Sequence, residues 1–406
     1  MKKKILFIMP SMFIGGAERS LLGLLEALDY SKVDVSLFLY RHEGEFLKYI
    51  PKEVDILPEI DEYKTFDVSV KSLLFSNKCI FGIKRILSKI AIKWNCCRKK
   101  TQAGVWMSMQ YTARYLQGLL PQIPGEYDLG IMYLGVADTL VNKVNAKVKM
   151  TWNHTDYDTL YPDKKMDLEI YKKLNYLVSV SEACNKKVKS FYPEIAEKAI
   201  VIENCLAEKL IKEQAKETVN DFEDNDSFIK LLSIGRYCEA KNFDNIPEIC
   251  KNILETGINI RWYIIGYGGD EPLIKQKIKE YDMEEYVILF GKKDNPYPYI
   301  ANCDIYIQPS RYEGKCVSVR EAQMLNKPVI ITRYETSSSQ LNDGVDGIIV
   351  PMENVACAEQ IARVIRDKEL QKRLIEECEE RDYSNREEVE KIYRILIDRE
   401  GESGKT

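Results

Sequence analysis

The sequence predicts an α/β protein built from two doubly wound domains. Three observations lead to this prediction. Short apolar segments alternate with amphipathic helical segments, the alternation begins twice along the chain, and a length of 406 residues suits two or three cores. Such alternation implies parallel sheets covered by helices on both faces, and the length excludes a single small binding module.

The first domain is expected to cover residues 1–205. Residues 5–9 are typical of a buried strand, and residues 33–39 alternate as a second strand. Between them, the apolar spacing from Leu21 to Leu28, after the turn at Gly15-Gly16, predicts a helix.

A polar linker is expected at residues 206–228, because Asp221 to Asp226 holds four carboxylates in six residues. The second domain is expected at residues 229–385, with residues 386–406 forming a C-terminal helix or tail. Residues 353–400 are charged and helical in period, and we expect them to complete the second domain. Two such domains would place a ligand cleft between the carboxyl ends of their sheets. The predicted strands of the second domain are 230–234, 260–265, 287–289, 305–308 and 329–332, with helices near 245–255 and 271–281.

Charge is distributed unevenly, although the formal net charge is only −4. Residues 68–125 contain no carboxylate and ten basic side chains, which leaves −14 for the other 348 residues. This basic sector predicts a local anionic partner, such as a lipid surface or a phosphorylated substrate, whereas the overall charge argues against a nucleic-acid binder.

Compartment signals favour the cytoplasm. The longest stretches without a charged residue are 13 residues, too short to span a bilayer as a helix. Met1 to Met9 imitates a secretory signal, but Pro10 interrupts it. Eleven cysteines without paired spacing predict neither a disulfide framework nor a zinc site, so a reducing environment fits best.

Three motifs bear residues suited to a diphosphate or a sugar. Gly15-Gly16 opens a helix, where backbone amides attract anions, although a simple tight turn explains it equally well. Arg236 and Lys241 follow a predicted strand and would clamp a diphosphate without a metal; two solvated cations are the alternative. Gly235 and Gly266 would let the backbone turn near that ligand.

Glu313 and Glu321 lie eight positions apart, one on a predicted loop and the other inside the next helix. Both carboxylates would accept hydrogen bonds from sugar hydroxyls, and free amides near Gly314 to Val317 would face the cleft. Two surface glutamates are the alternative reading.

Together these motifs resemble the GT-B glycosyltransferases of retaining family 4. The resemblance rests on Gly15 to Glu18, Gly235-Arg236 with Lys241-Asn242, Asn295 to Tyr299, and Ser310 to Glu321 with its Glu-x7-Glu pattern. It covers nearly the whole chain, and the nearest look-alikes build bacterial capsular, exopolysaccharide or O-antigen repeat units.

The resemblance implies a GT-B fold, with two Rossmann-like domains and an interdomain cleft, and a nucleotide-sugar donor, a UDP- or GDP-sugar, held mainly by the second domain. Arg236 and Lys241 would stabilise the leaving diphosphate, Glu313 would contact the donor sugar and Glu321 the ribose. No metal or other cofactor would be required. The candidate donor-binding positions are Gly15, Gly16, Gly235, Arg236, Lys241, Gly266, Lys315, Cys316, Val317 and Glu321.

His154 matches the family's active-site histidine, which would hydrogen-bond near the donor sugar; a structural role is the alternative. Asp156 and Asp158 imitate the metal-binding Asp-x-Asp pattern of the other major glycosyltransferase fold, but they lie in the first domain. Lys315-Cys316-Val317 departs from the apolar or proline residue that many relatives carry after Glu-Gly, which leaves the donor sugar open.

The basic sector contains an amphipathic segment. On a helix, Ile80, Ile83, Leu87, Ile90 and Trp94 share one face, with Arg85, Lys89 and Lys93 opposite. Such a helix would lie on an anionic bilayer, or it would pack its apolar face on the first domain.

The resulting prediction is a cytoplasmic enzyme, peripheral on the inner face of the membrane, that transfers a sugar to a lipid-linked or growing polysaccharide. A sugar-nucleotide epimerase of the same fold and a non-catalytic sugar-nucleotide-binding partner remain as alternatives. The sequence leaves open the base, the sugar, the acceptor, the pathway and the oligomeric state.

Overall fold

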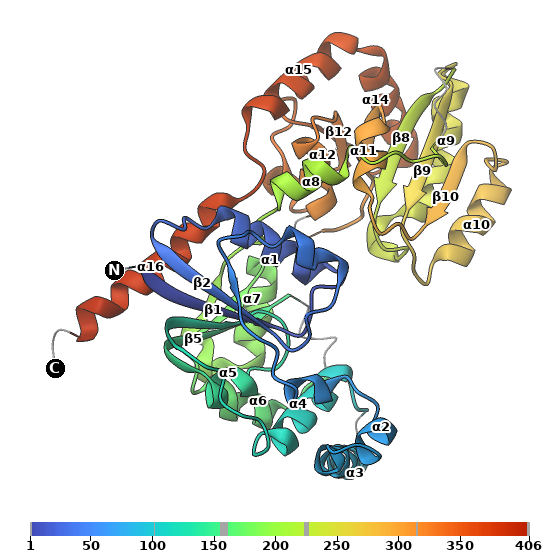
Figure 1. Cartoon of the computed structure of the whole chain (residues 1–406). Helices are drawn as coiled ribbons and strands as arrows, with labels where there is room; N and C mark the ends of the chain where they lie inside the picture. Colours follow the sequence, from blue (N-terminus) through green and yellow to red (C-terminus); the bar gives the residue numbers. More distant parts are fainter. Residues whose placement is uncertain (1, 101, 155–160, 223–226, 314–315, 404–406) are drawn as a thin grey trace. The chain divides into compact units, whose positions relative to one another are not determined.

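The computed structural model describes residues 2–100, 102–154, 161–222, 227–313 and 316–403, and these residues form two compact units (Figure 1). The first unit holds residues 1–205 and 385–406, and the second holds residues 206–384. Each unit contains one parallel sheet, so the predicted α/β class is confirmed. Among the described residues, no helix is both long and apolar enough to cross a membrane.

The first sheet has the order β3-β2-β1-β4-β5-β6-β7. Its central strand β1 is buried and pairs in parallel with β2 on one side and β4 on the other. Because the chain reverses its direction of winding between β1 and β4, the switch point of this sheet lies at their carboxyl ends. The strands are β1 (Lys3–Met9), β2 (Val33–Leu39), β3 (Asp55–Ile56), β4 (Glu126–Met132), β5 (Asn145–Asn153), β6 (Tyr176–Ser179) and β7 (Ala199–Val201).

The helices of the first unit include a group that extends from the sheet. The 21-residue α3 contacts α2 and α4, and all three fall within the basic sector (Figure 1). The helices are α1 (Gly16–Ala27), α2 (Val70–Leu74), α3 (Cys79–Lys99), α4 (Val105–Leu116), α5 (Asp138–Lys143), α6 (Lys164–Tyr171), α7 (Glu182–Phe191) and α16 (Val389–Ser403), with 3₁₀ turns η1 (Glu45–Tyr49), η2 (Tyr63–Phe66), η4 (Pro193–Lys198) and η7 (Arg386–Glu388).

The second sheet repeats this topology, with the order β10-β9-β8-β11-β12-β13 and its switch point between β8 and β11. Its neighbours Leu231 and Leu232 belong to different apolar clusters, one on each face, which confirms the predicted double covering. The strands are β8 (Ile229–Ile234), β9 (Ile260–Ile265), β10 (Val287–Gly291), β11 (Ile305–Gln308), β12 (Val329–Thr332) and β13 (Ile348–Val350).

The helices of the second unit alternate with these strands, as the apolar periodicity predicts. They are α8 (Glu208–Gln214), α9 (Ile246–Glu255), α10 (Glu271–Glu280), α11 (Tyr297–Asn302), α12 (Val317–Met324), α13 (Ser337–Gln340), α14 (Asn354–Arg366) and α15 (Lys368–Glu380), with 3₁₀ turns η5 (Glu239–Lys241) and η6 (Phe243–Asn245).

The C-terminal segment differs from the expectation that residues 353–400 complete the second domain. From Asn385 onward the chain belongs to the first unit. Val389 and Ile392 are buried there, and the Lys391 ammonium donates to the carbonyl oxygen of Val201 at 3.1 Å. Helical period alone does not reveal which core receives an apolar face.

The expected linker also differs from the structure. Residues 206–222 pack onto the second unit, because α8 buries Leu210 and Ile211, and Phe222 joins the apolar cluster that contains Tyr263. Residues 223–226, which carry three of the four clustered carboxylates, lie outside the described residues.

Candidate active site

Two loops meet at the switch point of the second sheet, one after β8 and the other after β11. The Arg311 backbone amide donates to the carbonyl oxygen of Ala240 at 2.8 Å. The Arg311 guanidinium forms a two-point ion pair with the carboxylate of Asp244, with N–O distances of 2.7 and 2.9 Å. These contacts hold the two loops together, so residues from both can act on one ligand.

Lys241 and Glu313 form an ion pair across these loops. The Lys241 ammonium donates to Glu313 Oε1 at 2.5 Å, and the two side chains are 17% and 13% exposed. The Ser310 hydroxyl donates to the same oxygen at 2.7 Å, and the Thr336 hydroxyl donates to the Glu313 carbonyl oxygen. Glu313 is therefore fixed from both its side chain and its backbone.

The charge of Lys241 is also fixed. Burial on its own lowers the pKa of the ammonium, but the Glu313 carboxylate and the hydrogen bonds that the ammonium donates to Glu313 and to the Cys316 sulfur outweigh burial and raise that pKa above its ordinary value. Burial raises the pKa of the Cys316 thiol, so this group stays protonated at neutral pH. The site thus carries a permanent cation next to one carboxylate.

Two glycines make room for this arrangement. A Cβ atom on Gly235 would lie 2.9 Å from Lys241 Cε, and one on Gly266 would lie 1.8 Å from the Gly235 carbonyl oxygen. Gly266 has a φ of +154°, which disfavours other residues. The loops after β8 and β9 therefore pack backbone against backbone beside Lys241.

Arg236 is exposed in the loop that carries Lys241. Within the described part of the chain, its side chain has no ion pair and no hydrogen bond. One cation at this switch point is thus held by a carboxylate, and the other is open to solvent.

The predicted site residues around α12 differ in their burial and in their hydrogen bonds. Glu321 is buried, and the Tyr297 hydroxyl donates to its Oε1 at 2.9 Å. Val317 is exposed at the first residue of the helix. The Cys316 amide differs from the expected free donor, because it donates to Gln340 Oε1 at 2.7 Å. Gly314 and Lys315 lie outside the described residues.

In the first unit, Gly15 and Gly16 lie where β1 leads into α1, as expected. Gly16 is exposed, and a Cβ atom there would meet nothing within 4 Å, so steric crowding does not require glycine at this position. At Gly15, a Cβ atom would lie 2.2 Å from Glu18 Oε2. Burial raises the pKa of the Glu18 carboxyl, which lies in the first turn of the same helix.

His154 follows β5 and contacts Tyr133. Its Nε2 lies 2.9 Å from the Tyr133 carbonyl oxygen, which only accepts, so Nε2 carries the hydrogen. Burial lowers the pKa of His154 to about 4, so the ring is neutral at pH 7 and Nδ1 is left as an acceptor. The Tyr133 hydroxyl lies 2.7 Å from Ser20 Oγ, and Ser20 donates to Asn204. The hydrogen bond to the Tyr133 carbonyl oxygen orients the imidazole of His154, and the contacts with Ser20 and Asn204 hold the Tyr133 side chain.

Sequence reasoning missed the residues that position the site. The sequence gives no signal for Arg311, Asp244 or Thr336, because each acts through a contact with a residue that is distant along the chain. Arg311 and Asp244 lie 67 residues apart, and Thr336 lies 23 residues from Glu313. Asp156 and Asp158 lie outside the described residues.

Part of the second unit is similar to a known protein family. Residues 214–381 match the family described as Glycosyl transferases group 1, so the predicted resemblance is confirmed for this segment at that level. Retaining family 4 stays a prediction.

Two curated relatives match shorter stretches. The chain is 28% identical over 131 residues to the amylovoran biosynthesis glycosyltransferase AmsK of Erwinia amylovora, covering 30% of this chain and 32% of the relative. It is 27% identical over 162 residues to a Campylobacter jejuni N-acetylgalactosamine-N,N'-diacetylbacillosaminyl-diphospho-undecaprenol 4-alpha-N-acetylgalactosaminyltransferase, covering 40% of each. The chain thus matches less than half the length of these relatives.

A solved structure matches nearly the whole chain. TarM of S. aureus, determined in complex with UDP among other ligands, superposes with a TM-score of 0.61 at 13% identity, over 97% of this chain and 100% of TarM. The two Rossmann-like units therefore have the GT-B fold.

Proposed function

We propose that this protein is a retaining glycosyltransferase of polysaccharide biosynthesis that moves a sugar from a nucleotide-sugar donor to a lipid-linked or growing glycan. The observation that carries the proposal is the Lys241–Glu313 pair beside Arg236 at the second switch point. The match of residues 214–381 to Glycosyl transferases group 1 and the names of the relatives support it.

The donor diphosphate would bind to Arg236 and Lys241. Arg236 offers a planar, two-point donor, and Lys241 offers a compact charge that its neighbours keep protonated. As the glycosidic bond breaks, negative charge grows on the leaving diphosphate. Lys241, which Glu313 holds in place, would stabilise this charge without reorganisation, and Arg236 would add a second positive charge. Glu313, held by Ser310 and Thr336, would position Lys241 and contact the donor sugar.

The test of the donor site is calorimetry with UDP and GDP. Each charge-assisted hydrogen bond contributes about 1.5–3 kcal/mol, so replacing both Arg236 and Lys241 by Ala should weaken nucleotide binding at least about 100-fold. The control replaces Lys275 and Lys279, on α10 of the same unit, by Ala. Equal affinity of the two double variants would overturn the assignment.

The proposal includes sugar transfer without a metal ion, because Arg236 and Lys241 would already bind the diphosphate and offset its negative charge. We expect EDTA to leave the transfer rate unchanged. A loss of activity that Mg²⁺ or Mn²⁺ restores would contradict this part.

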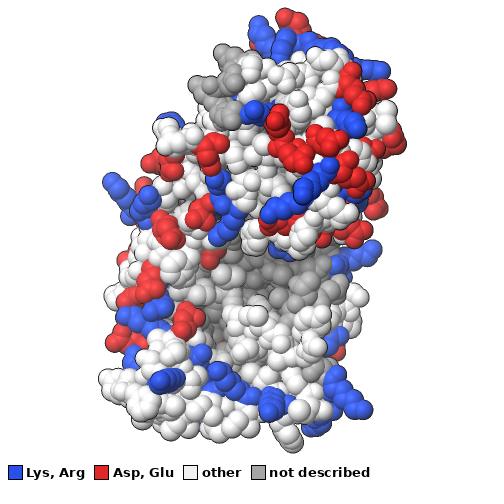
Figure 2. Space-filling view, turned by 90° about the vertical axis from the view of Figure 1, so that its right-hand side faces the viewer, with Lys and Arg blue, Asp and Glu red and all other residues white. Residues whose placement is uncertain are grey.

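The proposal also places the enzyme on the inner face of the cytoplasmic membrane, through α3. Ile83, Leu87, Ile90 and Trp94 are exposed, with 69% of Trp94 accessible, so this face does not pack on the first unit. The opposite face, with Phe81, is buried instead. Over α2 and α3, the surface is mainly white and blue, without the dense mixture of red and blue seen elsewhere (Figure 2). An exposed apolar face flanked by cations fits an anionic bilayer.

Arg85 differs from the other cations of this helix. It donates to the carbonyl oxygens of Thr65 and Val68, and burial lowers its pKa. It therefore holds the chain before α2 in place, whereas Lys89 and Lys93 stay exposed.

A further inference from the structure

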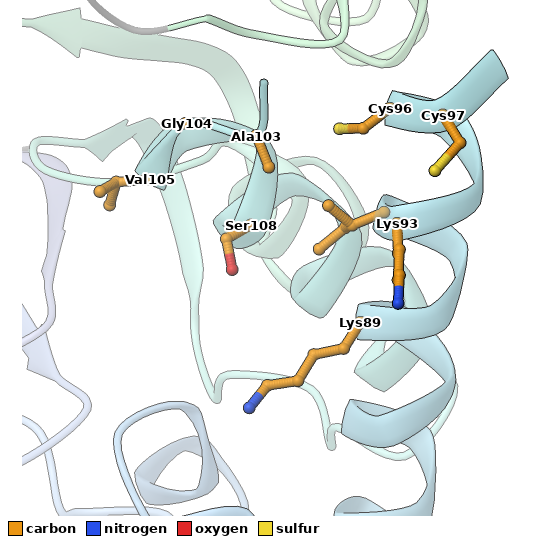
Figure 3. Close-up of a pocket in the computed structure, with 9 residues that line it drawn as sticks. Lys89, Lys93, Cys96, Cys97, Ala103, Gly104, Val105 and Ser108 are labelled. Carbon is orange, nitrogen blue, oxygen red and sulfur yellow. The ribbon is translucent and has the colours of Figure 1, made fainter. Parts of the chain in front are cut away.

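Two hollows adjoin in the first unit, and Ser108 of α4 lines both. The first is an open groove of about 650 Å³ between α3 and the start of α4. The second is a smaller pocket of about 160 Å³. Figure 3 shows Lys89 extending from α3 toward the side of α4 that carries Ser108, with Lys93 about one turn away along α3.

The groove is cationic and has no acidic neighbour on its own helices. Lys89 and Lys93 line it, and within the described residues neither ammonium has a carboxylate within 4.0 Å. No carboxylate occurs anywhere between residues 68 and 125. The ammonium groups of Lys89 and Lys93 lie one helical turn apart without a carboxylate partner, so they can bind an anion that contains one or more phosphate groups.

The groove borders the exposed apolar face of α3. Ile90 follows Lys89 directly, and Trp94 follows Lys93, with 59% and 69% of these apolar side chains exposed. A ligand that satisfied both surfaces would be an amphiphile, with a phosphate in the groove and an alkyl chain along the helix. A free inorganic anion would leave the apolar face unused.

The smaller pocket lies at the switch point of the first sheet. Pro10 follows β1, and Leu134 to Val136 follow β4, whose carboxyl ends meet there. Thr112, Thr139 and Asp67 offer hydroxyl and carboxylate groups. Tyr40 and Phe66, whose rings stack 5.3 Å apart, add aromatic surface. Polar groups beside aromatic rings suit a sugar.

The two hollows follow one edge of α3. Arg85 lines the pocket, and Lys89 and Lys93 line the groove, at intervals of four residues. Eight residues of helix span about 12 Å, which accommodates a diphosphate followed by one sugar.

We propose that the groove binds the diphosphate of a lipid-linked acceptor, and that the adjoining pocket binds the sugar attached to it. This inference rests on the proposed function and deepens it, because it selects the lipid-linked acceptor over a free growing glycan. Lys89 and Lys93 hold the diphosphate, the apolar face of α3 receives the start of the alkyl chain, and the reacting sugar points toward the switch point.

The test measures binding of farnesyl diphosphate, a short-chain probe with the required chemistry, by calorimetry on the full chain without any donor. Farnesol lacks the phosphates, and inorganic diphosphate lacks the chain. We expect each to bind at least about tenfold more weakly than farnesyl diphosphate, because each satisfies only one surface.

Three variants locate the site. Replacing Lys89 and Lys93 by Gln should weaken farnesyl diphosphate binding at least about tenfold. Ser108→Phe, at the exposed junction of the two hollows, should weaken binding of a lipid diphosphate that carries one sugar more than it weakens farnesyl diphosphate. The matched control replaces Lys71 and Lys84 by Gln, which removes the same charge from the same basic sector outside the groove, and its affinity should stay within about twofold.

Three outcomes would overturn the inference. Equal losses in the groove and control variants would show that only general surface charge attracts the probe. Inorganic diphosphate binding as tightly as farnesyl diphosphate would show a plain anion site. Dihexanoyl phosphatidylglycerol, kept monomeric below its micelle concentration, distinguishes the two lipid sources: if it binds the groove as tightly as farnesyl diphosphate, the site takes phospholipid and the proposal fails. Because no step requires glycosyl transfer, a failure of the proposed function would appear separately, as absent UDP binding.

Discussion

The two switch points share a topology but differ in how their charges are held. In the second unit, Lys241 is half of a shielded ion pair whose partner is fixed by two hydroxyls. In the first unit, Lys89 and Lys93 come from a helix outside the sheet, are exposed, and border an apolar surface. Rigid, paired charge suits one small polar ligand in a set geometry, whereas open charge beside apolar surface suits an amphiphile that arrives at a membrane.

The largest effect should come from the rigid side. Glu313→Gln removes the carboxylate that positions Lys241, and a misplaced catalytic group costs on the order of 100-fold in rate. We expect transfer, measured with radiolabelled donor, to fall by about that factor, while UDP affinity changes much less because both cations remain. The control is Asp343→Asn, at an exposed carboxylate paired loosely with Arg333 in the same unit. Full activity of Glu313→Gln would contradict the role given to the ion pair.

A smaller effect is expected on the open side. Replacing Ile83, Leu87 and Ile90 by Ser removes apolar surface that would enter the bilayer, and each such side chain contributes up to about 1.5–3 kcal/mol when fully buried. Because these side chains enter the bilayer only in part, we expect about tenfold weaker co-sedimentation with vesicles that contain phosphatidylglycerol. UDP binding and the thermal midpoint should not change, since these side chains are exposed in the folded chain.

The exposed and the buried face of α3 should respond differently to substitution. Ile92→Ser, on the buried face of the same helix, should instead lower the thermal midpoint. Unchanged vesicle binding of the triple variant would remove the membrane role.

The smallest effect concerns pH. The pKa of His154 lies near 4 in the folded chain, below the ordinary 6.5 of an unfolded histidine. The unfolded chain therefore binds more protons between pH 6.5 and 4, and the stability due to this group is lost as pH falls through that window. From pH 7 to 5 the loss should be at most about 2 kcal/mol, and His154→Asn should lack it.

The measurement is an NMR titration, which is simple because the chain has only two histidines. His154→Asn identifies the resonance. Above about pH 5.5, transfer should not vary with the protonation of His154. A titration of this ring near pH 6.5 would contradict the buried, neutral imidazole that donates to Tyr133.

Much of the fold was predictable because strand and helix periodicity is local. Residues 33–39, 260–265, 305–308 and 329–332 form strands with the expected bounds. The destination of the last helix was not predictable, because an amphipathic helix fits either core equally well until Tyr393 meets Asp29. The polar composition before β8 gave no sign that Phe222 is buried, because the burial of this ring depends on the apolar side chains that surround it in the second unit.

The sequence by itself determined the strand–helix alternation, the −14 and +10 division of charge, and the motif residues Arg236, Lys241, Glu313 and Glu321. Only the tertiary structure decided that Lys241 pairs with Glu313, that the Cys316 amide is occupied by Gln340, and that the apolar face of α3 is exposed while Arg85 turns inward. The physical reason is that pairing and burial depend on what lies opposite in space. Periodicity shows that a helix has two faces, but the rest of the fold determines which face is covered.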